Sequence, residues 1–473
     1  MKYHRLFYLF ILITAPFLLW GIFKILPTYD DWNTLSSPNF DSDWTKYFLP
    51  IGSFWRPFDA AFGYISAKDY TLFPNLNHFC IFIGHLINTF LIYRITHLLK
   101  FNSLACSIAT TLFYLSPCTL ATVLACDSLN QTYSQLWGLL AVWIYLSIEG
   151  RKKYVLMSIT IFIAALAKEN GLAWAIVPPI LAYGFRLIDT KRLWKDFLWG
   201  ICIALIYAVI RLSLPQNGDY NPDYQTFDLL RRMQEISMLF ANTFFAIDIM
   251  SIVHQPSRSL LPLGIITIIL SLPFILALVR TSNHWVSKEF LSLLICALIS
   301  VSPNLLLSLS LMNAYASLGM FAIMIGYLVN TMEQTQFIKI AFSLYIISAF
   351  IVATHYWHSS WKTSLAGKEM AQEVIRKSKQ QATKAYCLQI ESNTPKFSSF
   401  YVSPKDAFGW GIAVMHETGY QWPQELKDTT VKRNCQPEKI QRIAAKAFHN
   451  GYDCVWIVDD AEIQVIEKPD TNR

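Results

Sequence analysis

The segment LFYLFILITAPFLLWGIFKILPTYDDW (Leu6–Trp32) decides the fold of this chain. Its first part is apolar and long enough to cross a bilayer, which takes about 20 residues. The segment ends in two adjacent carboxylates, Asp30 and Asp31, where a membrane helix passes into an aqueous loop. An acidic pair at the edge of a membrane is costly unless it is paired or used. The segment therefore predicts a membrane protein with a candidate site at PTYDDW.

The composition of the whole chain also indicates a membrane protein. Of the 473 residues, 54% are hydrophobic and only 15% are charged, whereas a soluble globular protein carries about 25% charged residues. Residues 358–473 hold 30 of the 71 charged side chains. We predict an all-α polytopic transmembrane bundle over residues 1–357 and a small soluble α/β domain over residues 358–473.

Charge-poor segments predict about 11 transmembrane helices. Two of these helices are expected within Phe290–Met332, which contains no charge over 43 residues and is broken near Ser302-Pro303-Asn304 or Asn313. The remaining segments are Leu6–Pro27, Tyr70–Tyr93, Phe101–Cys126, Ser128–Ile148, Tyr154–Ala167, Asn170–Phe185, Phe197–Pro215, Ser259–Val279 and Ile340–Trp361.

One further apolar segment, Ile236–Val253, carries Asp248. We expect it to be re-entrant or to lie at the interface, because a spanning helix here would place Arg280 and Lys288 outside. The alternative is a bundle of 12 helices with a cytoplasmic C-terminal domain.

The distribution of basic residues orients the bundle, because Lys and Arg are enriched in cytoplasmic loops. The first long loop, residues 27–74, carries six Asp against three basic residues and is predicted to face outward. With an odd number of spans, the C-terminal domain faces outward as well. The predicted cytoplasmic groups are Lys2/Arg5, Arg94/Lys100, Arg151–Lys153, Arg186/Lys191/Arg192/Lys195 and Arg280/Lys288.

The first outer loop is rich in aromatic residues and contains the sequence FWRPF, Phe54–Phe58. Tryptophan and tyrosine prefer the headgroup level, so we expect the loop to lie along the membrane surface. Arg56 stands before a proline that favours a helix start. A guanidinium in this place suits a phosphate or a carboxylate, and the alternative is that it extends to lipid headgroups.

The second span carries His78, His85 and Asn88 on one helix face. Polar residues within a span normally face the bundle interior. We list His85 as a candidate substrate contact, and the alternative is that these residues hydrogen-bond between helices. No pattern of metal ligands such as HxxxH or CxxC occurs here, so no metal site is predicted.

A second polar feature on the outer side is ALAKENG, Ala165–Gly171. The apolar segments on either side, of 14 and 16 residues, are short for a crossing. We therefore expect Lys168 and Glu169 to be sunk below the outer surface as a binding position. The alternative is an ordinary surface ion pair, which contributes little to stability. The polar cluster Cys126–Gln131 either completes a cleft over the first loop or forms a simple turn.

Four segments, taken in order, resemble the GT-C glycosyltransferases: TYDDW, FWRPF, PNLNHFCIFIGHLIN and ALAKENG. The similarity is to bacterial relatives of the protein O-mannosyltransferases and of the lipid A aminoarabinose transferase. It covers roughly residues 1–190 and continues more weakly to about residue 360. It implies a multi-pass enzyme of the bacterial inner membrane whose active site faces the periplasm. Such an enzyme takes a sugar from a polyprenyl-phosphate carrier and gives it to a glycan, a lipid or a protein.

The resemblance also implies roles for individual residues. Asp31 or Asp30 would be the general base on the acceptor hydroxyl, and which of the two acts is left open, with Asp31 preferred. Arg56 would contact the donor phosphate or orient the aspartate. Lys168 and Glu169 would border the donor site.

Two details depart from the family pattern or leave it open. Many relatives carry an arginine before an aromatic pair in a late helix, whereas this chain has Asn313 ahead of Tyr315. Some branches bind a divalent cation through an acidic DxD-like motif, and Asp41-Ser42-Asp43 has that form. We predict no resident metal, and Mg²⁺ or Mn²⁺ is left open as a cofactor.

The expected chemistry needs one base and therefore predicts inversion at the anomeric carbon. No P-loop or GxGxxG motif occurs, which fits a lipid-linked donor and not a nucleotide sugar. The net charge of +7 is ordinary for a positive-inside membrane protein and does not indicate nucleic-acid binding. The alternative function is a transporter, flippase or export component for lipid-linked saccharides. A transporter is expected to show inverted repeats, and the sequence shows no internal repeat.

The C-terminal domain shows short strand-like segments alternating with helical ones. The expected strands are Tyr386–Ile390, Phe400–Val402, Cys454–Val458 and Ile463–Ile466, and the expected helices are Pro404–Thr418 and Pro437–Asn450. If the domain is in an oxidising compartment, we expect one disulfide, between Cys435 and Cys454.

Overall fold

The computed structural model describes most of the chain. The described residues are 2–26, 48–50, 54–68, 75–126, 128–216, 229–245, 260–303, 312, 315–333, 335–377, 382–390, 425–432, 435–459 and 462–468. Asp30, Asp31, Asp41 and Asp43 lie outside these residues, as do the segments expected at 400–402 and 404–418.

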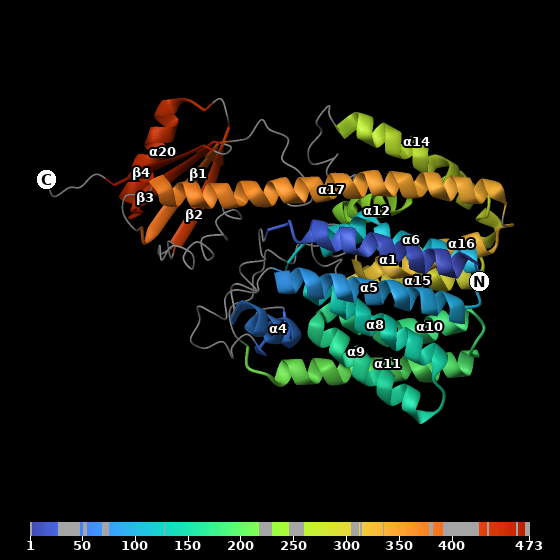
Figure 1. The fold of residues 1–473 in the computed structure, drawn as a ribbon. Helices are drawn as coiled ribbons and strands as arrows, with labels where there is room; N and C mark the ends of the chain where they lie inside the picture. Colours follow the sequence, from blue (N-terminus) through green and yellow to red (C-terminus); the bar gives the residue numbers. More distant parts are fainter. Residues whose placement is uncertain are drawn as a thin grey trace.

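The described residues between 2 and 377 form a helical bundle in which the long helices run side by side (Figure 1). The helices follow the charge-poor segments closely. Their bounds are α1 Lys2–Ile22, α4 Pro57–Lys68, α5 Asn75–Leu98, α6 Ser103–Leu115, α7 Pro117–Val123, α8 Leu129–Ser147, α9 Arg151–Ala167, α10 Val177–Gly184, α11 Thr190–Ser213, α12 Leu229–Phe245, α14 Leu260–Val279, α15 Lys288–Val301, α16 Tyr315–Asn330 and α17 Gln336–Lys377.

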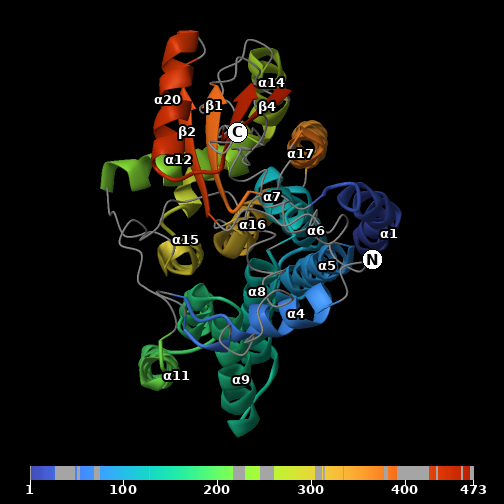
Figure 2. The ribbon, with the colours of Figure 1, turned by 90° about the vertical axis from the view of Figure 1, so that its left-hand side faces the viewer.

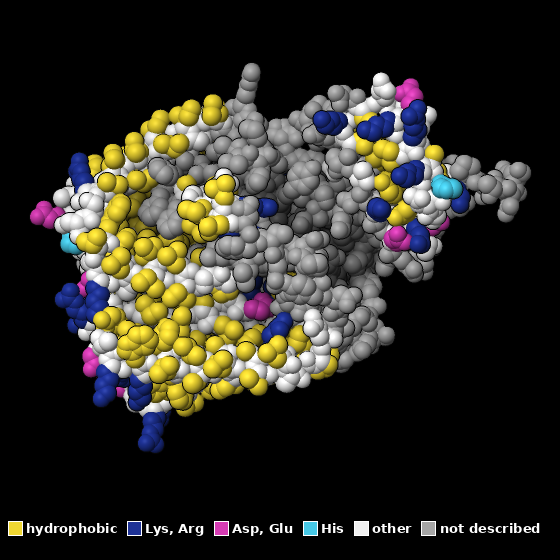
Figure 3. All heavy atoms as spheres, turned by 180° about the vertical axis from the view of Figure 1, so that it is seen from behind, with side chains coloured by type: hydrophobic (Ala, Val, Ile, Leu, Met, Phe, Trp, Pro, Cys, Tyr) yellow, Lys and Arg dark blue, Asp and Glu magenta, His cyan; other side chains and the backbone are white. Residues whose placement is uncertain are grey.

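The surface of the bundle is that of a membrane protein. Among the described residues, four helices contain a segment long and apolar enough to cross a bilayer: Asn75–Leu98, Thr190–Ser213, Leu261–Val279 and Gln336–Lys362. Shorter apolar helices, such as Ser103–Leu115 and Tyr315–Asn330, pack among them. Large apolar side chains cover the flank of the bundle, and Lys and Arg gather at one end of it (Figure 3).

The segment that was ambiguous in the sequence begins in α12. This helix lies across the direction of the long helices (Figure 2). Its first turns carry Arg231, Arg232 and Glu235, and the carboxylate of Glu235 accepts hydrogen bonds from both guanidinium groups, at 3.1 and 2.6 Å. An amphipathic helix with charges in its first turns favours an interfacial position. Residues 246–253 lie outside the described part of the chain.

The C-terminal part forms a four-stranded sheet of order β2-β1-β3-β4. Strands β1 (Lys384–Ile390), β2 (Glu425–Val431) and β3 (Cys454–Asp459) are parallel, and β4 (Glu462–Glu467) is antiparallel to β3. Helix α20 (Pro437–His449) packs Ala444 and Ala447 against one face of the sheet. An α/β fold with strands β1, β3 and β4 and helix α20 is therefore confirmed, and β2 is a strand that the sequence did not predict.

The predicted disulfide between Cys435 and Cys454 is wrong, because both residues are free thiols. Alternation along β3 places Cys454 with Trp456 on one face of the sheet. Cys435 packs against the apolar cluster on the opposite face, which includes Ala444 and Ala447 of α20. The sheet itself separates the two sulfur atoms.

The two ends of the bundle differ. Helix α4 and the C-terminal sheet lie at one end, and the N-terminus of the chain lies at the other (Figure 1). Helix α17 is continuous through residues 357 and 358, and the ammonium group of Lys377 in its last turn donates to the carbonyl of Ile463 at 2.7 Å. This long helix therefore connects the bundle to the sheet.

Candidate active site

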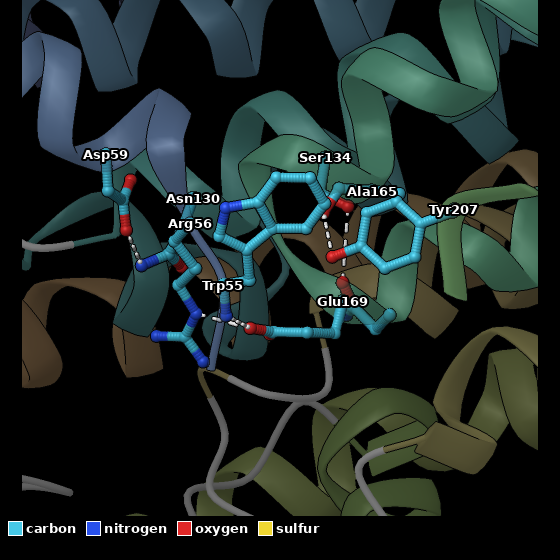
Figure 4. A network of polar contacts seen from close by, with 9 residues as sticks. Trp55, Arg56, Asp59, Asn130, Ser134, Ala165, Glu169 and Tyr207 are labelled. Carbon is cyan, nitrogen blue, oxygen red and sulfur yellow. Dashed lines mark hydrogen bonds and ion pairs between the residues drawn. The ribbon is translucent and has the colours of Figure 1, made fainter. Parts of the chain in front are cut away.

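The part of the first long loop that contains Trp55 and Arg56 is anchored to the ALAKENG segment by one carboxylate. Glu169 Oε1 accepts from the backbone N–H of Trp55 at 2.8 Å, and its Oε2 accepts from Arg56 Nε at 3.2 Å. Both charged side chains are about one quarter exposed, at 25% and 26%. Figure 4 shows the outer end of the Arg56 guanidinium pointing away from Glu169. The structure thus brings together two segments that the sequence identified separately.

Local sequence explains why residues 55 and 56 lie in this position. Pro57 starts α4, because its fixed φ suits the first helical position. Trp55 is buried in a small apolar cluster with Ala165 and Tyr207, and its ring lies 5.2 Å from that of Tyr207. The guanidinium of Arg56 also lies over the ring of Phe54, at 4.5 Å. Burial of Trp55 therefore holds Arg56 at the edge of the bundle.

The ALAKENG segment is a break between two helices. Helix α9 ends at Ala167, Lys168 is extended (φ −155°, ψ 143°), and a 3₁₀ helix, η2, follows over Glu169–Ala175. The N–H of Gly171 donates to the carbonyl of Lys168 at 2.8 Å. A Cβ on Gly171 would lie 2.2 Å from the carbonyl carbon of Ala164, so only glycine fits this close return of the chain.

Lys168 and Glu169 occupy different environments. The side chain of Lys168 is 7% exposed, whereas that of Glu169 reaches the start of α4. The lysine is buried in the bundle, and the carboxylate contacts protein backbone and Arg56, while a position of the pair below the outer membrane surface stays a prediction. Glu169 therefore positions the first loop in this structure.

A second contact ties α4 to α8, and the sequence did not single it out. Asn130 Nδ2 donates to Asp59 Oδ2 at 2.7 Å, and both residues are buried. Asp59 lies in the first turn of α4, where a carboxylate favours the positive end of the helix dipole. The polar cluster around Asn130 thus contacts the first loop through Asp59, and a cleft completed by this cluster stays a prediction. The one signal for Asp59 in the sequence is its position three residues after Arg56.

Further along α8, Ser134 Oγ donates to Asn170 Oδ1 at 3.2 Å. This contact links α8 to the 3₁₀ helix η2. The start of α4, helix α8 and the 3₁₀ helix η2 are thus joined by polar contacts.

His85 lies in the bundle interior, away from this network. Its Nδ1 lies 3.0 Å from the Tyr315 hydroxyl, and its Nε2 lies 3.2 Å from the Tyr114 carbonyl. Asn88 Nδ2 also donates to the Tyr315 hydroxyl, at 3.1 Å. Both ring nitrogens of His85 thus contact other helices, which favours the interpretation of hydrogen bonding between helices.

The described residues that flank Asp30 and Asp31 in the chain are Leu26 and Phe48. The described chain stops at Leu26, whose N–H donates to Ser364 Oγ at 3.2 Å, and resumes at Phe48, whose carbonyl accepts from Trp55 Nε1 at 3.0 Å. Among the described residues, no group of three His, Cys, Asp or Glu side chains is placed to hold a metal ion.

Comparison with solved structures identifies the fold. The chain is similar to ArnT from Cupriavidus metallidurans bound to undecaprenyl phosphate, with a TM-score of 0.52 and 10% identity over 99% of this chain and 98% of that one. The apo structure of the same protein gives a TM-score of 0.50 and 12% identity over 97% of both chains. The chain has a GT-C-like fold.

The resemblance drawn from the four sequence segments is therefore confirmed at the level of the fold, and over nearly the whole chain. No family model and no curated protein sequence matches the chain. At 10% identity the likeness concerns the backbone architecture. The roles of individual residues rest on the contacts described above and on the sequence.

Proposed function

We propose that this protein is a GT-C-type membrane glycosyltransferase. It moves a sugar from a polyprenyl-phosphate-linked donor to an acceptor hydroxyl on a glycan, a lipid or a protein. The observation that carries the proposal is the contact of Arg56 with Glu169, which joins the first outer loop to the helix break. This contact occurs in a fold similar to that of ArnT bound to undecaprenyl phosphate.

The charges at this end of the bundle suit a phosphate leaving group. Glu169 holds the Nε side of Arg56, and the outer end of the guanidinium points away from it (Figure 4). Lys168 is the second cation at the same break. Cationic groups in a partly dehydrated place stabilise the negative charge that develops on a departing phosphate. We assign this task to Arg56 and Lys168.

Asp31, or Asp30, supplies the base in this proposal. The acceptor oxygen attacks the anomeric carbon and forms a new C–O bond as the bond from that carbon to the phosphate oxygen breaks. The aspartate takes the acceptor proton, and polyprenyl phosphate leaves with the electron pair of the broken bond. A single displacement inverts the anomeric carbon. A general base of this kind contributes typically about 10²- to 10⁴-fold to the rate.

The finer topology belongs to the same proposal. We place about 11 spans in the membrane, with residues 358–473 and the site on the outer side of a bacterial inner membrane. The concentration of Lys and Arg at the end opposite α4 supports this orientation (Figure 3). The proposal requires no resident metal, and Mg²⁺ or Mn²⁺ dependence is tested by assaying transfer with and without a chelator.

The experiment that tests the proposal compares Asp30→Asn and Asp31→Asn with Asp69→Asn, a matched control in the same outer loop. Each variant is expressed in a host lacking the native copy, and the glycan products of the envelope are quantified by mass spectrometry. We expect one of the first two variants to lose about 10²-fold or more of the product while accumulating in the membrane like wild type. Unchanged product in both, with normal accumulation, would refute the aspartate base.

A further inference from the structure

A second site candidate is a hollow at the end of the bundle opposite α4. Its volume is about 910 Å³, which lies within the usual range for ligand pockets, about 300–1,000 Å³. Helices α9, α10, α11 and α15 contribute to its lining. The cationic side chains in the lining are Arg186, Lys191, Arg192, Lys195 and Lys288.

The hollow carries an excess of positive charge. Five cations against Asp189, the one carboxylate among the lining residues, leave a formal charge of +4. Asp189 is already used, since its Oδ1 accepts from the backbone N–H of Arg192 at 2.8 Å and caps α11. Its carboxylate therefore belongs to the helix end.

The neighbouring carboxylates neutralise only the two arginines. Asp196 is fully buried, accepts from the Tyr154 hydroxyl at 2.7 Å and lies 3.6 Å from Arg192. Glu289 lies 3.5 Å from Arg186. Lys191 and Lys195 form no ion pair with any described carboxylate, and Lys288 lies over the Tyr183 ring at 3.3 Å. Three ammonium groups thus face the hollow without an anionic partner among the described residues.

The surroundings favour a lipid over a soluble anion. Trp194 and Leu198 lie on α11, three residues after Lys191 and Lys195 respectively, and are 59% and 57% exposed. Tryptophan prefers the headgroup level of a bilayer, and beyond Trp194 helix α11 continues as an exposed apolar face with Leu205 and Val209. A single lipid with its phosphate in the hollow and its acyl chains along α11 would contact both the cationic lining and the apolar face of that helix.

We propose that this hollow binds the phosphate headgroup of an anionic phospholipid in the leaflet opposite the transfer site. The positive-inside pattern alone accounts for basic residues at this end, but it does not require them to line one hollow between four helices. Basic pockets between transmembrane helices on the cytoplasmic side are suited to anionic headgroups. The site is separate from the proposed transfer chemistry and does not depend on it.

The test uses the double variant Lys191→Gln/Lys195→Gln, in which both residues are exposed on the first turns of α11. The matched control is Arg151→Gln/Lys152→Gln, which removes the same charge from exposed positions at the same end but outside the hollow. The charge-preserving variant Lys191→Arg/Lys195→Arg is the rescue. Each purified protein is placed in nanodiscs of phosphatidylcholine with increasing phosphatidylglycerol, and retained lipid is counted by native mass spectrometry.

We expect wild type, the control and the arginine variant to retain phosphatidylglycerol in preference to phosphatidylcholine. The glutamine variant should lose this preference by about 30-fold, from two lysine contacts. An equal loss in the control would overturn the proposal, because net charge alone would then explain binding. Displacement of the lipid by inorganic phosphate at millimolar concentration would also overturn it and indicate a soluble phosphate ligand. A thermal melt of each variant shows whether it is folded.

Discussion

Arg56 Nε lies 3.2 Å from Glu169 Oε2, although the two residues are 113 positions apart in the chain. The same carboxylate accepts from the backbone N–H of Trp55 at 2.8 Å. One side chain thus determines both the position of the first turn of α4 and the orientation of a cation beside the helix break. The pair is partly exposed, so its value is in positioning and not in stability.

Glu169→Gln separates these two effects. The amide oxygen still accepts from Trp55, but the charge opposite Arg56 is lost. We expect product formation to fall by about 10- to 100-fold because a displaced catalytic group is costly. The free energy of unfolding should change by less than about 1 kcal/mol. Products are measured by mass spectrometry and stability by thermal melts, with Glu149→Gln, between α8 and α9, as the control. A folded variant with full activity would contradict the positioning role.

Gly171→Ala tests the close return of the chain after Lys168. The added methyl group would meet backbone atoms of Ala164 at 2.2 Å, and backbone cannot move aside as a flexible side chain can. We expect a loss of about 1–3 kcal/mol of stability, measured as a lower midpoint of thermal unfolding in detergent. An unchanged midpoint would show that the segment repacks freely.

His85→Ala and Tyr315→Phe test the interior hydrogen bonds between α5, α6 and α16. Each substitution leaves a buried polar partner, so each should cost about 1–3 kcal/mol. The double variant should cost less than the sum, with a coupling of about 0.5–3 kcal/mol, because the two residues are in contact. Additive losses in thermal or denaturant unfolding would show that this contact contributes nothing.

The cysteines of the C-terminal domain give a chemical test of the sheet. Burial raises the pKa of the Cys454 thiol to about 12, so near neutral pH it stays protonated, and the thiolate is the reactive form. We expect native Cys454 to resist iodoacetamide at about pH 8 and to react once the protein is denatured without reductant. Mass spectrometry of the peptides locates the label. Failure of Cys435 and Cys454 to react after denaturation would indicate a disulfide and contradict the structure.

Much of the bundle could be predicted because a helix that crosses a bilayer must contain an apolar segment of about 20 residues. The break at Ser302–Asn304 corresponds to the end of α15 at Val301, and the short segments around Lys168 correspond to the 3₁₀ turn of η2. The sequence predicts Arg56 and Glu169 on the same side of the membrane, but it does not predict that their side chains are in contact. The hydrogen bond from the Trp55 backbone depends on tertiary packing, and no side-chain pattern reports it.

Other features could not be predicted for identifiable reasons. Strand β2 has the sequence ELKDTTV and pairs with β1 through its backbone. Its charged residues interrupt the apolar alternation by which a strand is predicted from sequence. The sequence does not show that Cys435 and Cys454 lie on opposite faces of the sheet, because the face of each residue depends on how the strands pair. The contact of Asp59 with Asn130 likewise needs the position of α4 on α8.

The most direct test of the proposed function is the lipid that accompanies the purified protein. Wild type, Asp31→Asn and Arg56→Ala are purified in mild detergent, and their lipids are extracted and identified by mass spectrometry. We predict a polyprenyl phosphate carrying a sugar with the aspartate variant, because binding persists while transfer stops, and less of it with Arg56→Ala. If all three proteins carry only bulk phospholipid in the proportions of the membrane, with no polyprenyl phosphate, the assignment of a lipid-linked sugar donor is contradicted.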